Sequence, residues 1–329
     1  MKKILILFLS IIALANFSYS QQNKTVSSII SAPMFAAIQN SAGEIVYSNL
    51  NNMWNKQTFF SSKNTKNDIS FWVSPIYSSI QGGDKRFSMD SVNTALGADI
   101  WLEDDSMIAL GFDLSFPKYS AFDNEVNADT IHVFTYYGAA VSESVELDFF
   151  MDYAFNYYKQ YRNFDDEQYK SEFDFSQYGG GFGLSQQIFS NNIFAIKPFV
   201  FYEYINLSIP SHSESEGPDA LSYKSQSQEI HKLEAGMNLI YCLNSKFNIG
   251  AALFYAGILG EASVKTTITN ADQSFFEDII GYETQRDSLG AGLNFNASIS
   301  IAVLSCRYKY IGANNQENHQ IIMNAVFAF

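Results

Sequence analysis

The chain has few of the residues that mark several large protein classes. Two Cys and six Pro among 329 residues exclude a disulfide-stabilised scaffold and a proline-rich linker protein. Only 16% of the residues are charged and 47% are hydrophobic, which excludes a disordered protein. Basic residues are scarce, 20 against 34 acidic ones. The net charge of -14 argues against a nucleic-acid partner, because phosphate binding needs a basic surface.

Long hydrophobic runs are missing as well. Beyond the N-terminal segment no apolar run approaches the roughly 20 residues of a membrane-spanning helix. The mean hydropathy of -0.08 also excludes a polytopic helical membrane protein. Aromatic residues are abundant, with 29 Phe and 20 Tyr. Two classes stay open: a soluble all-β protein, and a membrane protein whose apolar residues alternate with polar ones.

The first 20 residues indicate the compartment. Lys2 and Lys3 precede an apolar run over residues 4–17, and Ser18 and Ser20 supply the small residues that signal peptidase requires. We therefore expect a signal peptide over residues 1–20, cleaved near Ser20; an N-terminal core helix is the alternative. Cleavage leaves 18 basic and 34 acidic residues, a net charge of -16.

From residue 69 onward the sequence alternates with period two. Over residues 145–157 the odd positions are all apolar or aromatic, whereas the even positions include Glu146, Asp148 and Asp152. Residues 289–299 repeat the pattern with Gly, Asn and Ser on the second face. Such alternation indicates β-strands with one apolar face. That face is the interior of a soluble sandwich or the lipid side of an outer-membrane barrel.

The connections between strands distinguish these two folds. About twelve strands can be marked, at residues 69–79, 91–102, 105–116, 129–141, 145–158, 174–188, 193–207, 228–243, 246–260, 288–297, 299–311 and 319–329. Every second connection is long and polar. Alternating short turns and long loops with an even strand count predict a closed antiparallel transmembrane β-barrel over residues 69–329. A soluble lipocalin-like barrel, the competing fold, normally has about eight strands.

The last strand carries the most specific pattern. One face and an aromatic C-terminus are formed by Ile321, Met323, Ala325, Phe327 and Phe329. This segment looks like the terminal strand that the barrel-assembly machinery reads. We expect that machinery and outer-membrane lipid to be partners of the chain; an ordinary final strand that ends in Phe is the alternative.

Several short motifs occur in a fixed order along the predicted barrel. They are Phe71-Trp72-Val73, Leu96-Gly97-Ala98-Asp99, Ala109-Leu110-Gly111-Phe112, Gly179-Gly180-Gly181, Ile196-Lys197-Pro198-Phe199-Val200 and the final strand from His319 to Phe329. Together they make the chain from Phe71 to Phe329 resemble the C-terminal β-barrel (translocator) domain of autotransporters. Residues 80–90 hold only part of the Gly-rich loop usual there, and the turn near Ser298 lacks the usual Gly or Asp.

The resemblance implies a passenger upstream and a helix that threads the barrel lumen. Only 48 residues, 21–68, lie between the predicted signal and the barrel, so we expect the passenger to be almost absent. Residues 32–54 are predicted to form the helix, with Ser31 as its cap and Pro33 in its first turn. Its candidate lumen residues are Phe35, Ile38, Ile45, Met53 and Trp54. A disordered tail is the alternative, because Gly43 and the Asn residues weaken helix propensity.

Strand parity places nine charged side chains in the lumen. They are Asp99, Asp113, Glu146, Asp148, Asp152, Glu203, Glu234, Arg307 and Lys309. These residues could form a cation-leaning pore or a surface on which the helix docks. The alternative is ion pairing that stabilises the barrel wall, since an unpaired charge in a partly dry lumen is costly.

The long loops hold most of the remaining charge. The loops over residues 117–129, 160–173, 210–227 and 262–288 contain fifteen acidic and six basic residues, without a calcium-loop spacing. The four His are scattered, and no nucleophile elbow, P-loop or dinucleotide motif is present. We expect no enzyme activity, cofactor or metal, and a role in the outer membrane as an autotransporter-type barrel. A small porin or surface antigen, and an outer-membrane hydrolase using His212, stay open; any host or extracellular ligand of the loops is unknown.

Overall fold

The computed structural model describes residues 26–27, 29–59, 68–82, 87–103, 105–122, 124–191, 193–215, 217–270, 276–299, 302–313 and 316–328. The predicted signal peptide, residues 1–20, lies outside the described residues, as does Phe329. Among the described residues no helix has the length and apolar character needed to cross a membrane.

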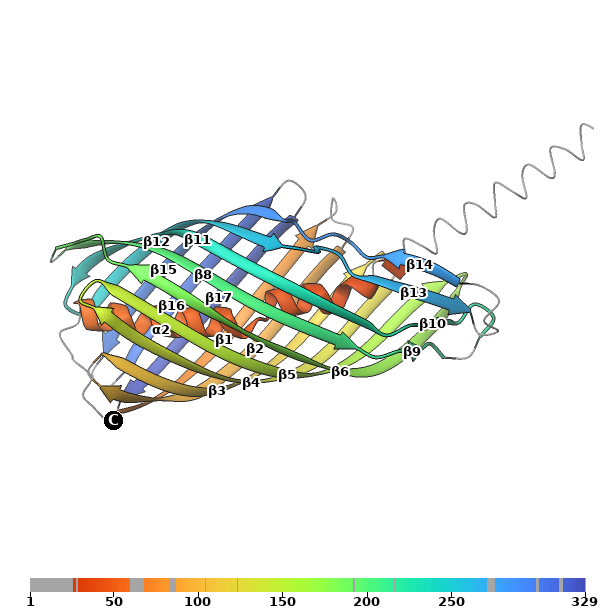
Figure 1. Cartoon of the computed structure of the whole chain (residues 1–329), viewed down its shortest axis with the longest axis horizontal. Coiled ribbons are helices and arrows are strands. Elements are labelled where there is room, and N and C mark those ends of the chain that lie inside the picture. The colour runs from red at the N-terminus through yellow and green to blue at the C-terminus, as the bar shows by residue number, and fades with distance from the viewer. Residues whose placement is uncertain are drawn as a thin grey trace, which may run out of the picture.

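Twelve strands form the wall of the molecule. They are β1 (Ile69–Gly82), β2 (Phe87–Glu103), β3 (Ser106–Ala121), β4 (Asn124–Ser142), β5 (Val145–Phe164), β6 (Glu167–Gln186), β8 (Phe194–Ile209), β11 (Gln226–Asn244), β12 (Phe247–Leu259), β15 (Asp287–Ile299), β16 (Ala302–Ala313) and β17 (Gln316–Ala328). Each pairs antiparallel with the next, β8 pairs with β11, and β17 pairs with β1. The sheet is therefore a closed barrel (Figure 1), and the predicted fold class is confirmed.

The alternation in the sequence becomes an inside and an outside. Along β1 and β3 every second side chain is exposed, and the exposed ones include Phe71, Val73, Leu110 and Phe112. Their neighbours in sequence point into the lumen and are buried. An outer surface of Phe, Leu, Val and Tyr is stable only against hydrocarbon, which is the arrangement of a transmembrane barrel.

Two connections predicted as loops are strand instead. The segment 117–128 continues β3 and β4 to a turn at Phe122, and 159–173 continues β5 and β6 to a turn at Asp165-Asp166. These three turn residues have φ of 53°, 52° and 65°. Two successive residues with positive φ form the tight turn that suits the twist of a hairpin. The sequence hid these extensions because the alternation is reversed there: Lys170 and Glu172 point outward, whereas Tyr169 and Phe173 point inward and are buried.

The other two long connections fold into a second sheet. It contains β9 (His212–Ser213), β10 (Leu221–Tyr223), β13 (Lys265–Asn270) and β14 (Phe276–Ile280), in the order β14-β13-β10-β9. It lies at the same end of the barrel as the turns of β3–β4 and β5–β6 (Figure 1). The Ser215 N–H donates to the Lys170 carbonyl of β6 over 2.7 Å. A two-residue strand, β7 (Phe189–Ser190), pairs with β8 near the opposite end.

We call the end of the barrel that carries these turns the mouth, and the sheet of β9, β10, β13 and β14 the mouth sheet. A buried ion pair joins the mouth sheet to the barrel. Arg162 of β5 donates from Nε and Nη2 to the two carboxylate oxygens of Glu214, at 2.8 and 2.7 Å. Tyr223 donates its hydroxyl to Glu214 over 2.7 Å, and the Leu221 N–H donates to the same carboxylate. Both charged side chains are fully buried. Fork-shaped pairing with additional donors offsets the cost of burying the two charges.

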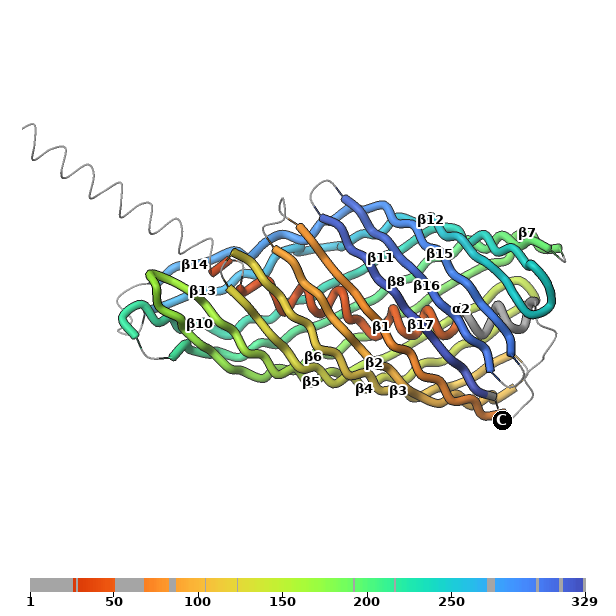
Figure 2. Tube along the Cα trace, turned by 180° about the vertical axis from the view of Figure 1, so that it is seen from behind, coloured from red at the N-terminus to blue at the C-terminus, as the bar shows by residue number. Residues whose placement is uncertain are grey.

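Two helices run lengthwise inside the barrel (Figure 2). Residues 26–27 and 29–39 are helical, and α2 spans Ala42–Phe59. The single helix predicted over 32–54 is therefore broken at Asn40 and Ser41 and longer at both ends. Ser31 is not a cap, since its hydroxyl donates to the Ser27 carbonyl inside the first helix. Pro33 likewise lies inside the first helix and not in its first turn.

The mouth sheet should respond to acid through His212. Its ring stacks on Phe173 and Tyr223, with centroid distances of 3.9 and 4.7 Å. Burial lowers the pKa of His212, against the smaller opposing effects of the Pro210 carbonyl and the Glu214 carboxylate. The unfolded segment then binds a proton more readily than the folded one. The stability that neutral His212 provides is complete above its ordinary pKa and is lost as the pH falls below that value.

We expect proteolysis within residues 210–225 of the purified protein to accelerate between pH 7.5 and about pH 5. The variant His212→Phe keeps a stacked ring without a titrating group and should show a flat profile over that range. An equal acceleration in this variant would mean that another group, such as Glu214, controls the sheet.

Candidate functional site

The lumen around the break between the two helices is the candidate site. Charged side chains from three barrel strands converge there: Glu203 from β8, Lys232 and Glu234 from β11, and Lys309 from β16. All four are buried. They meet the end of the first helix, the break, and the first turn of α2.

Glu203 and Lys232 compensate the two helix ends at the break. The Gly43 N–H of α2 donates to Glu203 Oε1 over 3.1 Å. Lys232 Nζ donates to Glu203 Oε2 at 2.8 Å, to Ser41 Oγ at 2.8 Å and to the Ile38 carbonyl at 3.3 Å. A carboxylate thus faces a helix N-terminus and an ammonium faces a helix C-terminus. Both placements match the sign of the helix dipole.

Lys309 connects α2 to the same network. Its Nζ lies 2.6 Å from Glu44 Oε1 and 2.5 Å from Glu234 Oε1. Glu44 belongs to the first turn of α2, where an acidic residue is favourable. Lys232 lies 4.0 Å from the same Glu44 oxygen. Every charge in this group has a partner, which is the condition for keeping charges in a dry interior.

Gly43 allows α2 to approach the wall closely. A Cβ on this residue would lie 2.7 Å from Glu203 Oε1 and 2.9 Å from Phe150 Cζ. Any other residue would therefore push the helix away from the carboxylate that accepts its N–H. The sequence alone suggested that Gly43 weakens the helix; in the structure its lack of a side chain permits the contact.

We call the five charged residues at the helix break, Glu44, Glu203, Lys232, Glu234 and Lys309, the belt. Neutral hydrogen bonds hold the helices on both sides of the belt. Asn40 Oδ1 accepts from Asn93 Nδ2 at 3.2 Å and from Ser78 Oγ at 3.4 Å. Further along α2, Tyr47 accepts from Asn238 over 3.0 Å, and the Arg307 guanidinium lies 4.9 Å from the Tyr47 ring centroid. Asn324 donates to Asn49.

The half of the lumen near the mouth is apolar, contrary to the polar lumen that the sequence suggested. Phe35 of the first helix lies 4.7 Å from Phe87 and 6.2 Å from Tyr119, measured between ring centroids. Inward side chains from eight wall strands, β1 to β6, β8 and β11, contribute to this buried cluster. Closer to the mouth, Val26 and Ile30 pack under the mouth sheet against Ile268 and other residues. The helices are thus enclosed on all sides rather than docked by one apolar face.

All nine predicted lumen charges lie on the inner side of the wall, although they do not form one group. Glu203, Glu234 and Lys309 belong to the belt at the helix break. Other acidic residues pair within the wall: Asp99 accepts from Trp72 and Tyr136, Asp113 lies 3.3 Å from His132, and Glu146 pairs with Lys197 at 2.7 Å. Asp148 and Asp152 line the lumen on β5, and Arg307 contacts Tyr47.

Sequence reasoning missed Lys232, Lys197 and Glu44. Lys232 has the same parity as Glu234, two residues further along β11, so the alternation could have found it. Lys197 was visible only as part of a family motif. Glu44 follows Ser41 with the S-x-x-E spacing of a capping box, which marks the start of a helix at residue 42 and conflicts with one continuous helix over residues 32–54.

The remaining predicted residues divide between the lumen and the outer surface. Phe35 and Ile45 are buried and Ile38 is half-buried. The side chains of Met53 and Trp54 lie outside the described residues. On β17 Ile321 and Met323 face outward, Ala325 and Phe327 are half-buried, and Phe329 lies outside the described residues.

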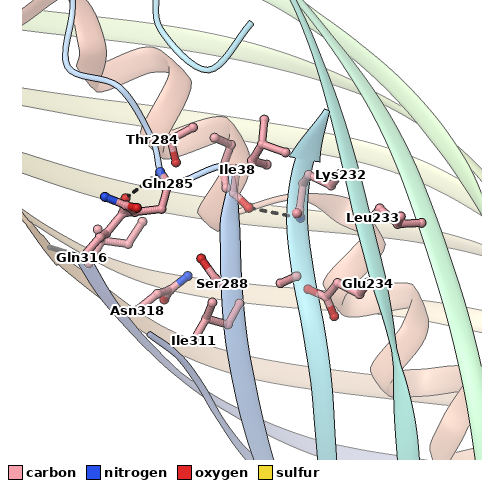
Figure 3. Close-up of a pocket in the computed structure, with 14 residues that line it drawn as sticks. Ile38, Lys232, Leu233, Glu234, Thr284, Gln285, Ser288, Ile311, Gln316 and Asn318 are labelled. Carbon is pink, nitrogen blue, oxygen red and sulfur yellow. Dashed lines mark hydrogen bonds between the residues drawn. The ribbon is translucent and has the colours of Figure 1, made fainter. Parts of the chain in front are cut away.

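A small cavity of about 60 Å³ lies beside the helix break (Figure 3). Ile38, Ile258 and Ile311 line its sides, and Lys232 and Glu234 lie at its charged end. A volume of this size has room for roughly four ordered waters. Within the described ranges, no three His, Cys, Asp or Glu side chains are grouped to hold a metal ion.

These features define an outer-membrane β-barrel whose lumen is filled by helices that precede its first strand. A model of the autotransporter beta-domain matches residues 71–309, and the chain belongs to that family. The resemblance predicted from the motifs is confirmed, and so is an outer-membrane location. No curated protein matches the chain.

Solved structures share the fold at low sequence identity. The translocator domain of the autotransporter NalP from Neisseria meningitidis is 13% identical, with a TM-score of 0.69 over 87% of this chain and 99% of that one. The beta domain of the Bordetella autotransporter BrkA is 10% identical, with a TM-score of 0.56 over 79% and 99%. The Pseudomonas putida toluene transporter TodX is 10% identical, with a TM-score of 0.50 over 80% and 89%.

Removing one partner of the buried belt should loosen the helices. Lys232→Met leaves Glu203 without its cation, and we expect a loss of about 3–5 kcal/mol in unfolding free energy. Adding Glu203→Gln should recover part of this loss, because the amide oxygen still accepts from the Gly43 N–H. Denaturant unfolding of the purified barrel in detergent measures both. Lys265→Met, which breaks the exposed pair with Glu261, is the control and should cost under about 1 kcal/mol. Equal losses in the single and double variants would show that the two residues are not coupled.

Proposed function

We propose that this protein is an autotransporter-type barrel in its plugged form, which anchors the segment preceding Val26 at the cell surface. The observation that carries the proposal is the direction of the chain. Val26 lies under the mouth sheet, and the helices then run through the lumen toward the end where β1 begins. In transmembrane barrels the short turns are periplasmic and the longer connections extracellular. The segment ahead of Val26 would then be outside the cell.

The helices that fill the lumen favour an anchoring role over a role as an open pore for diffusing solutes. Residues 29–37 are buried, ion pairs hold the break, and the apolar cluster at Phe35 fills the lumen near the mouth. A chain threaded in this way cannot leave without breaking the belt at Glu203 and Lys232. An open small porin, the alternative, would require the helices to leave the lumen.

A hydrolase is disfavoured by the surroundings of His212. Its ring is stacked on Phe173 and Tyr223, and its Nδ1 lies 3.1 Å from the Pro210 carbonyl. That nitrogen is occupied by a backbone oxygen, not by a serine or a carboxylate that could form part of a catalytic triad. We propose a structural role for His212 and no enzyme activity for the chain.

Export requires the predicted signal peptide, and insertion requires the last strand. We propose cleavage near Ser20 and recognition of the outward face of β17, at Ile321 and Met323, by the barrel-assembly machinery. The exposure of both side chains to the membrane supports the second point. The mature N-terminus would then begin at Gln21, just ahead of Val26.

The location of the N-terminus can be tested on intact cells. We expect an epitope tag and protease site inserted after Gln21 to be cleaved by externally added protease. The same insertion in the short turn at Ser144 should be cleaved only after the outer membrane is permeabilised. Protection of the Gln21 site in cells where the barrel is correctly folded would place the segment in the periplasm and contradict the anchoring proposal.

Conductance separates a plug from a pore. We expect the full-length protein to be nearly silent in planar bilayers, and deletion of residues 26–59 to produce discrete channel openings. Lys232→Met should give intermediate, brief openings, because it weakens the belt without removing the helices. Steady openings of the unmodified protein, equal to those of the deletion variant, would favour the porin alternative.

A further inference from the structure

A polar trough lies on the outer flank of the barrel near the mouth, where β3 to β6 extend beyond the membrane. Along β3 the outward side chains change from apolar Leu114 and Phe116 to Lys118. The outer face is therefore in contact with water at this level. The trough lies between the ends of the β3–β4 and β5–β6 hairpins. Its volume of about 410 Å³ falls within the range of roughly 300–1,000 Å³ that is typical of small-ligand sites.

Residues from four strands line the trough, and the strand register brings them together. Glu125 of β4 pairs with Tyr161 of β5. Two residues nearer the turn, Asn163 pairs with Gln168 of β6, whose amide donates to Asn163 Oδ1 over 3.1 Å. The Asn163 N–H donates to Asn124 Oδ1 over 3.0 Å, which connects the two hairpins. The lining thus includes two aromatic rings, three amides and a carboxylate: Phe122, Tyr161, Asn124, Asn163, Gln168 and Glu125.

Phe122, at the turn between β3 and β4, is the residue that local structure explains least. Its φ of 53° is a conformation that bulky residues rarely adopt, whereas Asp165 and Asp166, at another turn with positive φ, tolerate it better. Its side chain is 50% exposed, so burial compensates this strain only in part. A strained aromatic residue held in water at the rim of a trough indicates a binding role.

An exposed aromatic ring beside several amides matches the chemistry of a sugar. One face of a pyranose ring carries C–H bonds, which stack on an aromatic ring. Its edge carries hydroxyl groups, which both donate and accept hydrogen bonds. The amides of Asn and Gln also donate and accept, so they can bind two neighbouring hydroxyls.

The charges around the trough disfavour an anionic sugar. Three exposed acidic residues lie at the adjoining β5–β6 turn, Asp165, Asp166 and Glu167. The nearby cations already have partners: Lys118 lies 3.1 Å from Glu125, and Lys170 lies 2.6 Å from Glu172. An anion in the trough would therefore meet net repulsion. A neutral sugar has no such cost.

We propose that this trough binds a neutral pyranose unit of a glycan. The C–H face of the sugar stacks on Phe122, and its hydroxyls bond to the amides of Asn163 and Gln168. A bound sugar covers the exposed ring and so compensates the strained turn. The glycan belongs either to the cell's own surface polysaccharide or to a source outside the cell. Both present the same chemistry to the trough.

A substitution at the turn separates binding from folding. Phe122→Asn removes the ring and relieves the backbone strain, because Asn adopts positive φ more readily. This variant should be at least as stable as the unmodified protein in denaturant unfolding. Phe276→Asn is the matched control, since Phe276 is 58% exposed on β14 of the mouth sheet and does not line the trough. Gln168→Ala removes one amide and keeps the ring.

The measurement is saturation-transfer NMR of the purified full-length protein in lauryldimethylamine oxide, a detergent without a sugar head group. The probes are the methyl glycosides of glucose, galactose, mannose and N-acetylglucosamine, with sialic acid as the anionic probe. We expect at least one neutral glycoside to bind, with the strongest saturation on one face of its ring, and sialic acid not to bind. Phe122→Asn should weaken binding about tenfold or more, and Gln168→Ala less. Phe276→Asn should leave binding unchanged.

Fluorescent albumin that carries the bound sugar distinguishes the two sources on intact cells. Binding to untreated cells identifies a glycan from outside as the ligand. Binding only after the surface polysaccharide has been removed identifies the cell's own glycan.

Three results would overturn the proposal. The first is a folded, purified protein that binds none of the neutral glycosides. The second is binding that Phe122→Asn leaves unchanged, or equal binding of sialic acid. The third is a clear loss of stability in Phe122→Asn, which would assign the ring a structural role.

Discussion

Closure of the sheet is the constraint from which the rest of this structure follows. A bilayer interior offers no partner to a backbone N–H or C=O, so a β-structure can cross it only when no strand edge is left open. Here β17 meets β1, for example at Phe327 opposite Phe71, and β11 meets β8. Pro75, which has no N–H, is paired with Thr94 of β2 and is skipped by the ladder to β17. Closure also explains the composition, because a wall with lipid outside and polar groups inside yields a mean hydropathy near zero.

A closed wall of this size creates an interior that must be filled, and the chain fills it with its own preceding segment. Side chains alone cannot reach across, so two helices occupy the lumen. Their ends leave backbone groups without intrahelical partners. At the break those groups meet Glu203 and Lys232, which were buried in the wall and needed partners of their own. The helix ends therefore give the buried wall charges their partners, and the wall charges give the backbone groups at the helix ends theirs. Neither set of groups would be stable alone.

The sequence predicted the wall far better than its contents, for physical reasons. Period-two alternation survives wherever lipid contacts one face, so the strands were found with small boundary errors. Above the membrane the outer face is wet and polar, while the inner face, with Tyr119 and Phe173, is buried in the apolar cluster near the mouth. The alternation therefore changes face there, and the sequence predicts loops around Phe122 and Asp165. The prediction of one continuous lumen helix was wrong for a different reason. A helix enclosed on every side has no single apolar stripe, and the break at Asn40 depends on Asn93 and Lys232, whose proximity only the folded barrel creates.

The distribution of charge explains how so acidic a chain can keep so many ionisable groups inside. In the belt, Glu44, Glu203 and Glu234 face Lys232 and Lys309, and elsewhere Glu146 faces Lys197. These interior pairs use three lysines for four glutamates, so they leave the balance of the remaining charges almost unchanged. At the mouth Arg162 is likewise paired with Glu214. The acidic excess of the chain is therefore carried largely by the long connections, which hold fifteen acidic and six basic residues. It repels anionic surfaces over about a Debye length, roughly 8 Å at physiological salt, and need not reflect a ligand at all.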